Sequence, residues 1–208
     1  MNALIERVAP YATHMIRTDH AHVLAAFHQY QTDSAPRVKK GLVNTVCLAL
    51  EVHAQLEEEI FYPAMRAVSD SDFLRKAVPE HNEMRRLITQ LRNMEPTDAG
   101  YDGTFMELMR DVMHHVADEE TTVLPEAERL MRDRLGELGA KMTRRRLELM
   151  APRSGAMATN MARSLPATSI ALAAGLVAGG VLLGNRLLSS RPHRFGSGTR
   201  TGASGRWL

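Results

Sequence analysis

The sequence predicts an all-α protein, an up-down-up-down four-helix bundle followed by a C-terminal glycine-rich hydrophobic helix. Apolar residues recur at three- and four-residue spacing from about residue 13 to residue 150, and no alternating strand pattern competes with them. Breaks rich in Ser, Asp, Thr and Pro at residues 32–36, 69–72 and 95–100 divide this stretch into four segments. Short loops between helices favour antiparallel neighbours, which is the arrangement of such a bundle.

A change of composition after residue 150 predicts the remaining parts of the chain. Small, flexible residues there read as a linker, and residues 164–185 then carry no charge. A helix of that length rises about 33 Å, enough to cross a hydrocarbon core of about 30 Å. We therefore expect a bundle at 10–133, a helical extension and linker at 134–163, a transmembrane helix at 164–185 and a disordered basic tail at 186–208. A glycine-rich soluble helix or a disordered apolar tail is the alternative for 164–185.

The 164–185 segment also predicts where the protein resides. Its repeated GxxxG spacing is typical of membrane helices that pack closely, so a homo-oligomer is one expectation. Arginines lie on both sides of the segment and give no orientation. The first twenty residues lack the apolar region of a secretory signal, so we expect a cytoplasmic bundle anchored to the inner membrane by this C-terminal helix. The run Arg144-Arg145-Arg146 reads either as a contact with anionic lipid or as a solvated helix end.

Composition excludes several classes of protein. A single cysteine, Cys47, leaves no disulfide framework and no multi-cysteine zinc or iron–sulfur site. Residues 1–148 carry a net charge of −5 and the remainder +7, so the globular part is acidic and we expect no nucleic-acid partner.

Histidines and carboxylates on the apolar faces of the predicted helices point to chemistry. Each of the four segments places one histidine on its apolar face, and the second and fourth add a glutamate one turn later. Singly, an inward histidine is more often a hydrogen-bonded core residue, but six convergent groups of this kind are costly to bury unless a cation neutralises them. Imidazole and carboxylate without thiolate suit iron, manganese or zinc, and two carboxylates able to bridge favour a pair of metals. The six predicted ligands are His20, His53, Glu57, His81, His115 and Glu119.

This constellation resembles the hemerythrin and HHE cation-binding family over about residues 10–130. The motifs that carry the resemblance are Asp19-His20, His53-x-x-x-Glu57-Glu58 with Phe61-Tyr62-Pro63, Glu80-His81, and His115-x-x-x-Glu119-Glu120 with Leu124-Pro125. The resemblance implies a non-haem di-iron centre, with the four histidines as terminal ligands and the two glutamates Glu57 and Glu119 as bridging carboxylates. Tyr62 reads as a packing residue in preference to a hydrogen-bond donor into the pocket.

One position departs from the family's oxygen carriers. They place two histidines one turn apart on the third helix, whereas the residue four positions after His81 is Arg85. The resemblance then implies an open coordination position, filled by water or by Glu120. The alternative for Glu58 and Glu120 is solvated surface charge.

The expected function is a hemerythrin-like protein that binds iron, about two ions per chain, and a small ligand at a membrane. Iron is favoured over zinc or manganese, and dioxygen, nitric oxide or peroxide are the expected ligands, for sensing, scavenging or iron handling. The alternatives are a turnover enzyme for peroxide reduction or ferrous oxidation, and a membrane-tethered interaction module with a structural metal. The sequence identifies no catalytic residue and leaves open whether the protein is an enzyme.

Overall fold

The structure is a computed structural model that describes residues 5, 8–155 and 159–160. The expected transmembrane helix at 164–185 and the tail at 186–208 lie outside the described residues. Among those that are described, no helix combines the length and the apolar character needed to cross a bilayer.

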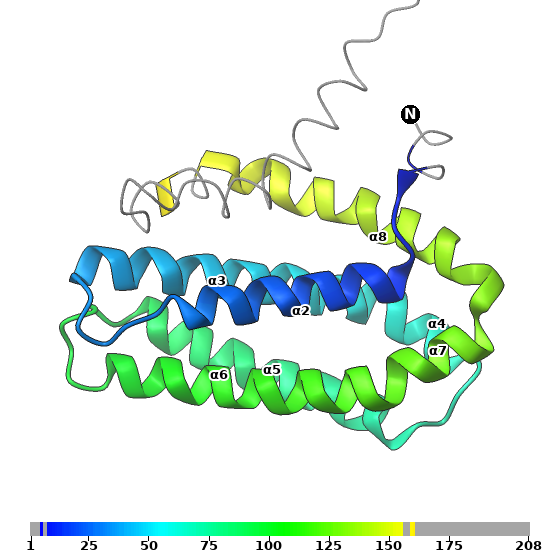
Figure 1. Cartoon of the computed structure of the whole chain (residues 1–208), viewed down its shortest axis with the longest axis horizontal. Coiled ribbons are helices and arrows are strands. Elements are labelled where there is room, and N and C mark those ends of the chain that lie inside the picture. The colour runs from blue at the N-terminus through cyan, green and yellow to red at the C-terminus, as the bar shows by residue number, and fades with distance from the viewer. Residues whose placement is uncertain (1–4, 6–7, 156–158, 161–208) are drawn as a thin grey trace, which may run out of the picture.

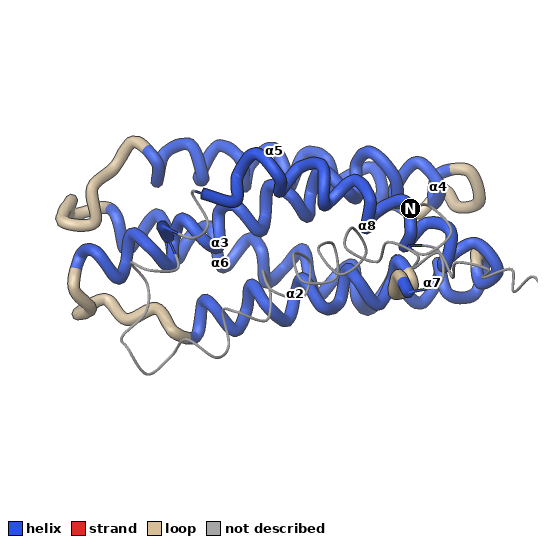
Figure 2. The backbone as a smooth tube through the Cα atoms, turned by 90° about the horizontal axis from the view of Figure 1, so that it is seen from above, coloured by secondary structure: helices blue, strands red, loops and turns tan. Residues whose placement is uncertain are grey.

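The described part of the chain is all-helical, as predicted, and its helices run alternately up and down (Figure 1). Viewed from above, the helices run along the long axis of the bundle, and the loops lie at its two ends (Figure 2). Helix α2 packs against α3, and α5 packs against α6. The bundle is built from α2 (Ala12–His28), α3 (Pro36–Leu56), α4 (Tyr62–Arg66), α5 (Asp72–Arg92), α6 (Tyr101–Asp118) and α7 (Leu124–Leu130).

The helices end and bend where the sequence contains prolines and small polar residues. Pro36 occupies the first turn of α3, where its missing N–H leaves no intrahelical bond unmade. Buried apolar residues recur along one side of α5, from Phe73 and Leu74 to Ile88 and Leu91, while its other positions are mostly charged or polar. Amphipathic helices of this kind bury their stripes against one another and define the bundle interior.

Two π-helical segments interrupt the long helices at equivalent places. They are η1 (Glu57–Phe61), between α3 and α4, and η2 (Glu119–Val123), between α6 and α7. Each begins at a predicted carboxylate ligand and is followed two residues later by a proline, Pro63 or Pro125. A proline inside a helix lacks an N–H and clashes with the carbonyl four residues earlier, and the wider π turn relieves that clash. At both carboxylates the regular hydrogen bonds of the α-helix are thus replaced by those of a π-helix.

The apolar core consists of two clusters with a polar layer between them. One cluster gathers around Phe61, Tyr62 and Met65, and the other around Leu87, Phe105 and Leu108. The buried histidines contact both, since Tyr62 stacks on His81 with ring centroids 5.8 Å apart, and Leu87's cluster includes the apolar residues that line the histidines from the other side. The core is therefore divided at the level of the predicted site.

A further helix, α8 (Leu135–Met150), lies along the bundle where the sequence suggested an extension and linker. It packs against α2 and α3 and runs across them as the uppermost helix of Figure 1. The closest approach is at Gly139, where an added Cβ would lie 1.9 Å from the carbonyl oxygen of Pro10. A glycine at this position lets the chain before α2 pass directly over α8.

We predict that Gly139→Ala destabilises the protein by about 1–3 kcal/mol, because the new methyl group collides with backbone that cannot swing away. Gly103→Ala in α6 is the matched control, since nothing lies within 4 Å of its Cβ position. That substitution is expected to be neutral or to stabilise by up to about 1 kcal/mol through helix propensity. Urea unfolding of both variants checks the difference, and equal effects would contradict the close packing of α8.

Candidate metal centre

The structure brings all six predicted ligands together in the polar layer of the bundle. His20 comes from α2, His53 from α3, His81 from α5 and His115 from α6, and the carboxylates come from the first positions of η1 and η2. All six side chains are buried, and those of Glu57 and Glu119 are 0% exposed. Their donor atoms form two groups within 4.8 Å, His20 with His53, Glu57 and Glu119, and Glu57 with His81 and His115.

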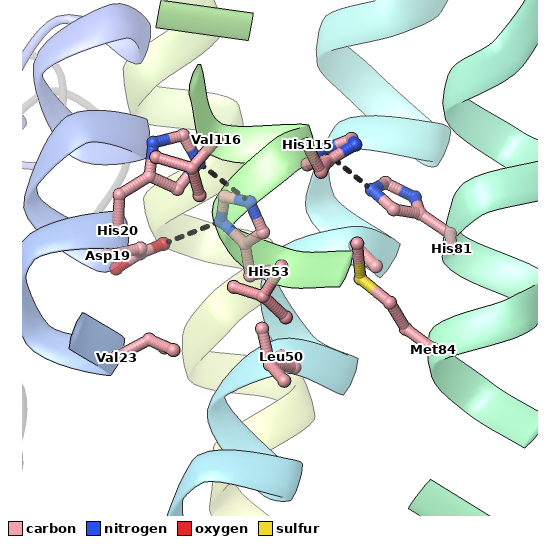
Figure 3. A pocket seen from close by; sticks show the side chains of 11 residues that line it. Asp19, His20, Val23, Leu50, His53, His81, Met84, His115 and Val116 are labelled. Atoms are coloured by element: carbon pink, nitrogen blue, oxygen red, sulfur yellow. Dashed lines mark hydrogen bonds and ion pairs between the residues drawn. The ribbon is translucent and has the colours of Figure 1, made fainter. Parts of the chain in front are cut away.

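The Nε2 atoms of the histidines meet in two pairs. His20 Nε2 lies 3.3 Å from His53 Nε2, and His81 Nε2 lies 3.2 Å from His115 Nε2 (Figure 3). Two neutral imidazole nitrogens that both present lone pairs repel each other at this distance, so a proton or a cation must lie between them. Two ligand atoms that each stand about 2.1 Å from one metal ion are themselves about 3.0–3.4 Å apart. The spacing within each pair fits that geometry.

Glu57 joins the two pairs. Its Oε1 lies 3.0 Å from His53 Nε2, and its Oε2 lies 3.4 Å from His81 Nε2. Glu119 Oε2 lies 3.3 Å from His20 Nε2. Glu57 is therefore placed to contact both histidine pairs, whereas Glu119, which was also expected to bridge, lies with His20 and His53 alone.

The hydrogen bonding of these carboxylates is incomplete. Both oxygens of Glu119 and the Oε1 of Glu57 are buried without a hydrogen-bond partner among the described residues. A buried carboxylate that lacks donors loses its hydration without compensation, which costs several kcal/mol. A cation at the meeting point of the Nε2 atoms supplies the missing interaction. The donor set and its unpaired oxygens therefore fit a metal, or two.

A second ring of carboxylates surrounds the histidines. Each Nδ1 faces one acid, at 2.8 Å for three of them and at 3.4 Å for His53 with Asp19. A carboxylate that accepts the Nδ1 hydrogen fixes the tautomer, turns Nε2 toward the centre and makes the imidazole a stronger ligand. The other three pairs are His20 with Glu120, His81 with Glu58, and His115 with Glu80.

These contacts repeat between the two halves of the bundle. The first half runs from α2 to η1 and contains His20 and His53, and the second runs from α5 to η2 and contains His81 and His115. The acid that precedes the first histidine of a half, Asp19 or Glu80, accepts from the second histidine of the same half. The glutamate that follows the carboxylate ligand, Glu58 or Glu120, accepts from the first histidine of the other half. The double acid in each motif thus has two uses, one toward the centre and one toward a neighbouring imidazole.

This arrangement corrects the sequence interpretation of Glu58 and Glu120. Both are bound to a histidine of the site, although Glu120 is also 36% exposed. Glu120 is not directed at the centre, because its Oε1 lies 2.8 Å from the outer nitrogen of His20. Arg85, in the place of a fifth histidine, turns outward and donates to Glu58 Oε1 at 2.9 Å. Helix α5 therefore contributes one histidine to the site, where the oxygen carriers contribute two.

Tyr62 contributes a hydroxyl to the site from the first half of the bundle only. Its side chain is buried, and its hydroxyl donates to Glu57 Oε2 at 3.0 Å, so it is a hydrogen-bond donor to the site as well as a packing residue. The equivalent position in the second half is Leu124, which has no donor. Burial, reinforced by the charges of Glu57 and Glu119, raises the pKa of the Tyr62 phenol well above its usual range, which keeps the hydroxyl protonated.

In the absence of a metal, protons take the place of the cation. Burial alone lowers the pKa of the His53 imidazole, but the charge of Glu57, the hydrogen bond with Asp19 and the charge of Asp19 outweigh it, and the pKa lies well above 6.5. Burial likewise opposes the charged form of Glu57, yet the neighbouring histidines hold its pKa below its usual range. His115 also has a raised pKa, because its bond to Glu80 and the Glu57 and Glu119 charges exceed the burial penalty.

A small apolar cavity lies against the histidine pairs, on the side away from Tyr62. Its volume is about 10 Å³, close to the minimum that holds one water molecule. Val23, Leu50 and Met84 close it beneath the four imidazoles (Figure 3). The space admits only a very small molecule, and apart from the histidines and Asp19 its walls are apolar.

We predict that the metal-free and metal-loaded proteins respond to pH in opposite directions. The folded-state pKa values of His53 and His115 are raised, so the metal-free protein binds more protons than the unfolded chain above pH 6.5 and loses stability as the pH rises from 6.5 to 8.5. The loss is at most roughly 1.4 kcal/mol per pH unit for each histidine. With metal bound the histidines are neutral, and stability rises with pH between 5 and 6.5. Urea unfolding at a series of pH values measures both slopes, and parallel slopes would contradict the ligand assignment.

Comparison with known proteins agrees with this geometry. The chain is 29% identical over 109 residues to a protein of Nostoc sp. (strain PCC 7120) named as a DNA nickase, and the match covers 52% of this chain and 31% of that protein. The chain thus spans about a third of the length of this relative. No solved structure matches the chain significantly. Residues 11–127 match the model of the hemerythrin HHE cation-binding domain, and that segment contains all six buried ligands, so the chain belongs to the hemerythrin HHE cation-binding family.

Proposed function

We propose that the bundle holds two iron ions and binds a small diatomic or peroxide ligand at them, for sensing, scavenging or iron handling. The observation that carries the proposal is the position of Glu57, whose two oxygens face histidines of different pairs, at 3.0 Å and 3.4 Å. A carboxylate in this position could be shared by two ions, and a single ion would leave one histidine pair without a partner.

The residues divide between the two ions according to the donor groups. His20 and His53, with Glu119, would hold one ion, and His81 with His115 would hold the other, with Glu57 shared between them. Iron supplies redox change and an exchangeable coordination position when bound. The outer acids orient the imidazoles, and the Tyr62 hydroxyl holds the second oxygen of Glu57.

The cavity and Arg85 support a small ligand. Because Arg85 is paired with Glu58, the third helix contributes one histidine and leaves a coordination position for an external molecule. The cavity beside the histidines has a volume of about 10 Å³, which limits that molecule to the size of dioxygen, nitric oxide, peroxide or water. Apolar walls favour dioxygen and nitric oxide, since neither requires hydrogen bonds from the protein.

The DNA nicking named for the Nostoc relative is not part of this proposal. The two proteins share a segment equal to 31% of that relative, and the acidic bundle offers no observation that favours a nucleic-acid substrate.

Metal content and absorption of the full chain, purified from iron-supplied cells, test the proposal. We expect about two irons per chain, near-ultraviolet charge-transfer bands, and a change in those bands when nitric oxide or oxygen is added to the reduced protein. Glu57→Gln should lose at least half of the iron, because the amide removes the charge shared by both ions. Glu59→Gln is the matched control, since Glu59 is two residues away and binds exposed Arg145.

Other outcomes separate the alternatives. Many turnovers with peroxide or ferrous iron would make the protein an enzyme at the same site. One tightly held zinc ion per chain, with no response to oxygen or nitric oxide, would make the metal structural and would overturn the proposal. Equal iron contents in Glu57→Gln and Glu59→Gln would overturn the bridging role.

We propose that residues 164–185 anchor the bundle to the inner membrane with the bundle on the cytoplasmic side. The support is the uncharged length of this stretch, which matches a hydrocarbon core of about 30 Å. We expect the full chain to sediment with membranes and to resist extraction with carbonate, and we expect Leu176→Arg with Val177→Arg to release it. A wild-type chain that stays in the soluble fraction would contradict the anchor.

A further inference from the structure

One side chain of helix α8, Arg146, is linked to a predicted ligand of the metal centre through hydrogen bonds. The helix begins at Leu135, beyond the matched family domain, which ends at residue 127. Arg146, near its C-terminal end, donates from Nη1 to Asp19 Oδ1 at 2.9 Å and from Nη2 to Asp19 Oδ2. The two residues are 127 positions apart in the chain, so the contact forms only when α8 is packed on α2.

Asp19 also contacts His53, one of the predicted metal ligands. The Oδ2 atom that Arg146 grips is also the acceptor for the Nδ1 of His53, 3.4 Å away. The Asp19 side chain is 11% exposed, and that of Arg146 is 30% exposed. A guanidinium that binds both oxygens of a carboxylate fixes the plane of that carboxylate, which a single hydrogen bond does not.

The other half of the site shows what the arginine adds. Glu80 is the counterpart of Asp19 and accepts from His115, and among the described residues no arginine or lysine lies within ion-pairing distance of it. Its side chain is 36% exposed and solvated. Asp19 is more deeply buried and has the longer bond to its histidine, so its orientation depends on the cation that α8 brings.

We propose, on the basis of the proposed metal centre, that Arg146 is a positioning residue. It holds the Asp19 carboxylate, and that carboxylate orients the His53 imidazole. Docking of α8 therefore strengthens metal binding. Coupling of this kind is reciprocal, and metal binding must then stabilise the docked α8 to the same degree. The position of the C-terminal helix and the occupation of the site are thereby linked.

The neighbouring arginine provides a matched control. Arg145 donates to Glu59 and Glu148, both on the outer surface, and contacts none of the six ligands or their outer acids. Arg145→Gln and Arg146→Gln each remove one guanidinium and its ion pairs from adjacent positions of the same helix. Arg146→Lys restores the positive charge but not the bidentate hydrogen bonding to the Asp19 carboxylate.

The test is the affinity of the full-length protein for cobalt(II), measured by its visible absorption in competition with a chelator. We expect Arg146→Gln to weaken binding about tenfold, the lower end of the 10- to 100-fold effect of removing a direct outer partner of a metal ligand, because Arg146 acts on His53 through Asp19. Arg146→Lys should recover part of that loss. Arg145→Gln should change the affinity less than threefold. Equal affinities for the two Gln variants would overturn the inference, whereas a wild-type protein that binds no metal would overturn the proposed function itself.

Amide hydrogen exchange supplies a second readout that a purely structural arginine would not move. Metal binding should slow the exchange of α8 amides in the wild-type and Arg145→Gln proteins and leave α8 unaffected in Arg146→Gln. The helix content of the metal-free variants shows that each is folded. If metal binding leaves the amide exchange of α8 unchanged in all three proteins, the proposed coupling is overturned.

Discussion

The burial of two carboxylates in the middle of a helical bundle is the constraint on which the rest of the structure depends. Glu57 and Glu119 have no exposed surface, and three of their four oxygens lack a hydrogen bond among the described residues. Such charges are tolerated only beside a cation, or beside histidines that hold protons in its place. The four imidazoles, their outer acids and the proline-linked π turns are all arranged around these two groups.

The two halves of the bundle surround their carboxylates with the same pattern of histidines and acids. The differences between the halves make the two sides of the site unequal. Tyr62 donates a hydrogen bond to Glu57, and the equivalent position in the other half is Leu124, whose side chain has no donor. Arginines support Asp19 and Glu58, while their counterparts Glu80 and Glu120 stand closer to solvent. A site assembled from two similar motifs therefore has two unequal halves, and Glu57 faces histidines of both.

Much of the fold and the inner ligand set follows from spacing. Apolar periodicity determines which side of a helix is buried, and a histidine with a glutamate four residues later must share that side, so all six inner groups were predictable. Periodicity does not determine which residues of different helices touch. For that reason the contacts of Glu58 and Glu120 with histidines of the other half were missed, although the doubled acids in both motifs were a visible signal. For the same reason, the sequence interpretation of Tyr62 favoured packing over the hydrogen bond that the tyrosine donates to Glu57.

The packing of α8 was beyond the reach of the sequence pattern. Residues 144–146 form a basic run that fits a membrane surface or a solvated end equally well, and only the docked helix shows that Arg145 and Arg146 bind acids of the bundle. Gly139, which permits the crossing beneath Pro10, looks like any glycine in a flexible segment until the close approach is known. Contacts over more than a hundred residues are set by tertiary packing and leave no local trace.

The position and number of bound metal ions test the central claim most directly. Crystals of the iron-loaded protein, measured at the iron absorption edge, should show two anomalous peaks about 3–4 Å apart, one beside the Nε2 atoms of His20 and His53 and the other beside those of His81 and His115, with Glu57 between them. A single peak, or peaks away from the buried carboxylates, would contradict the account.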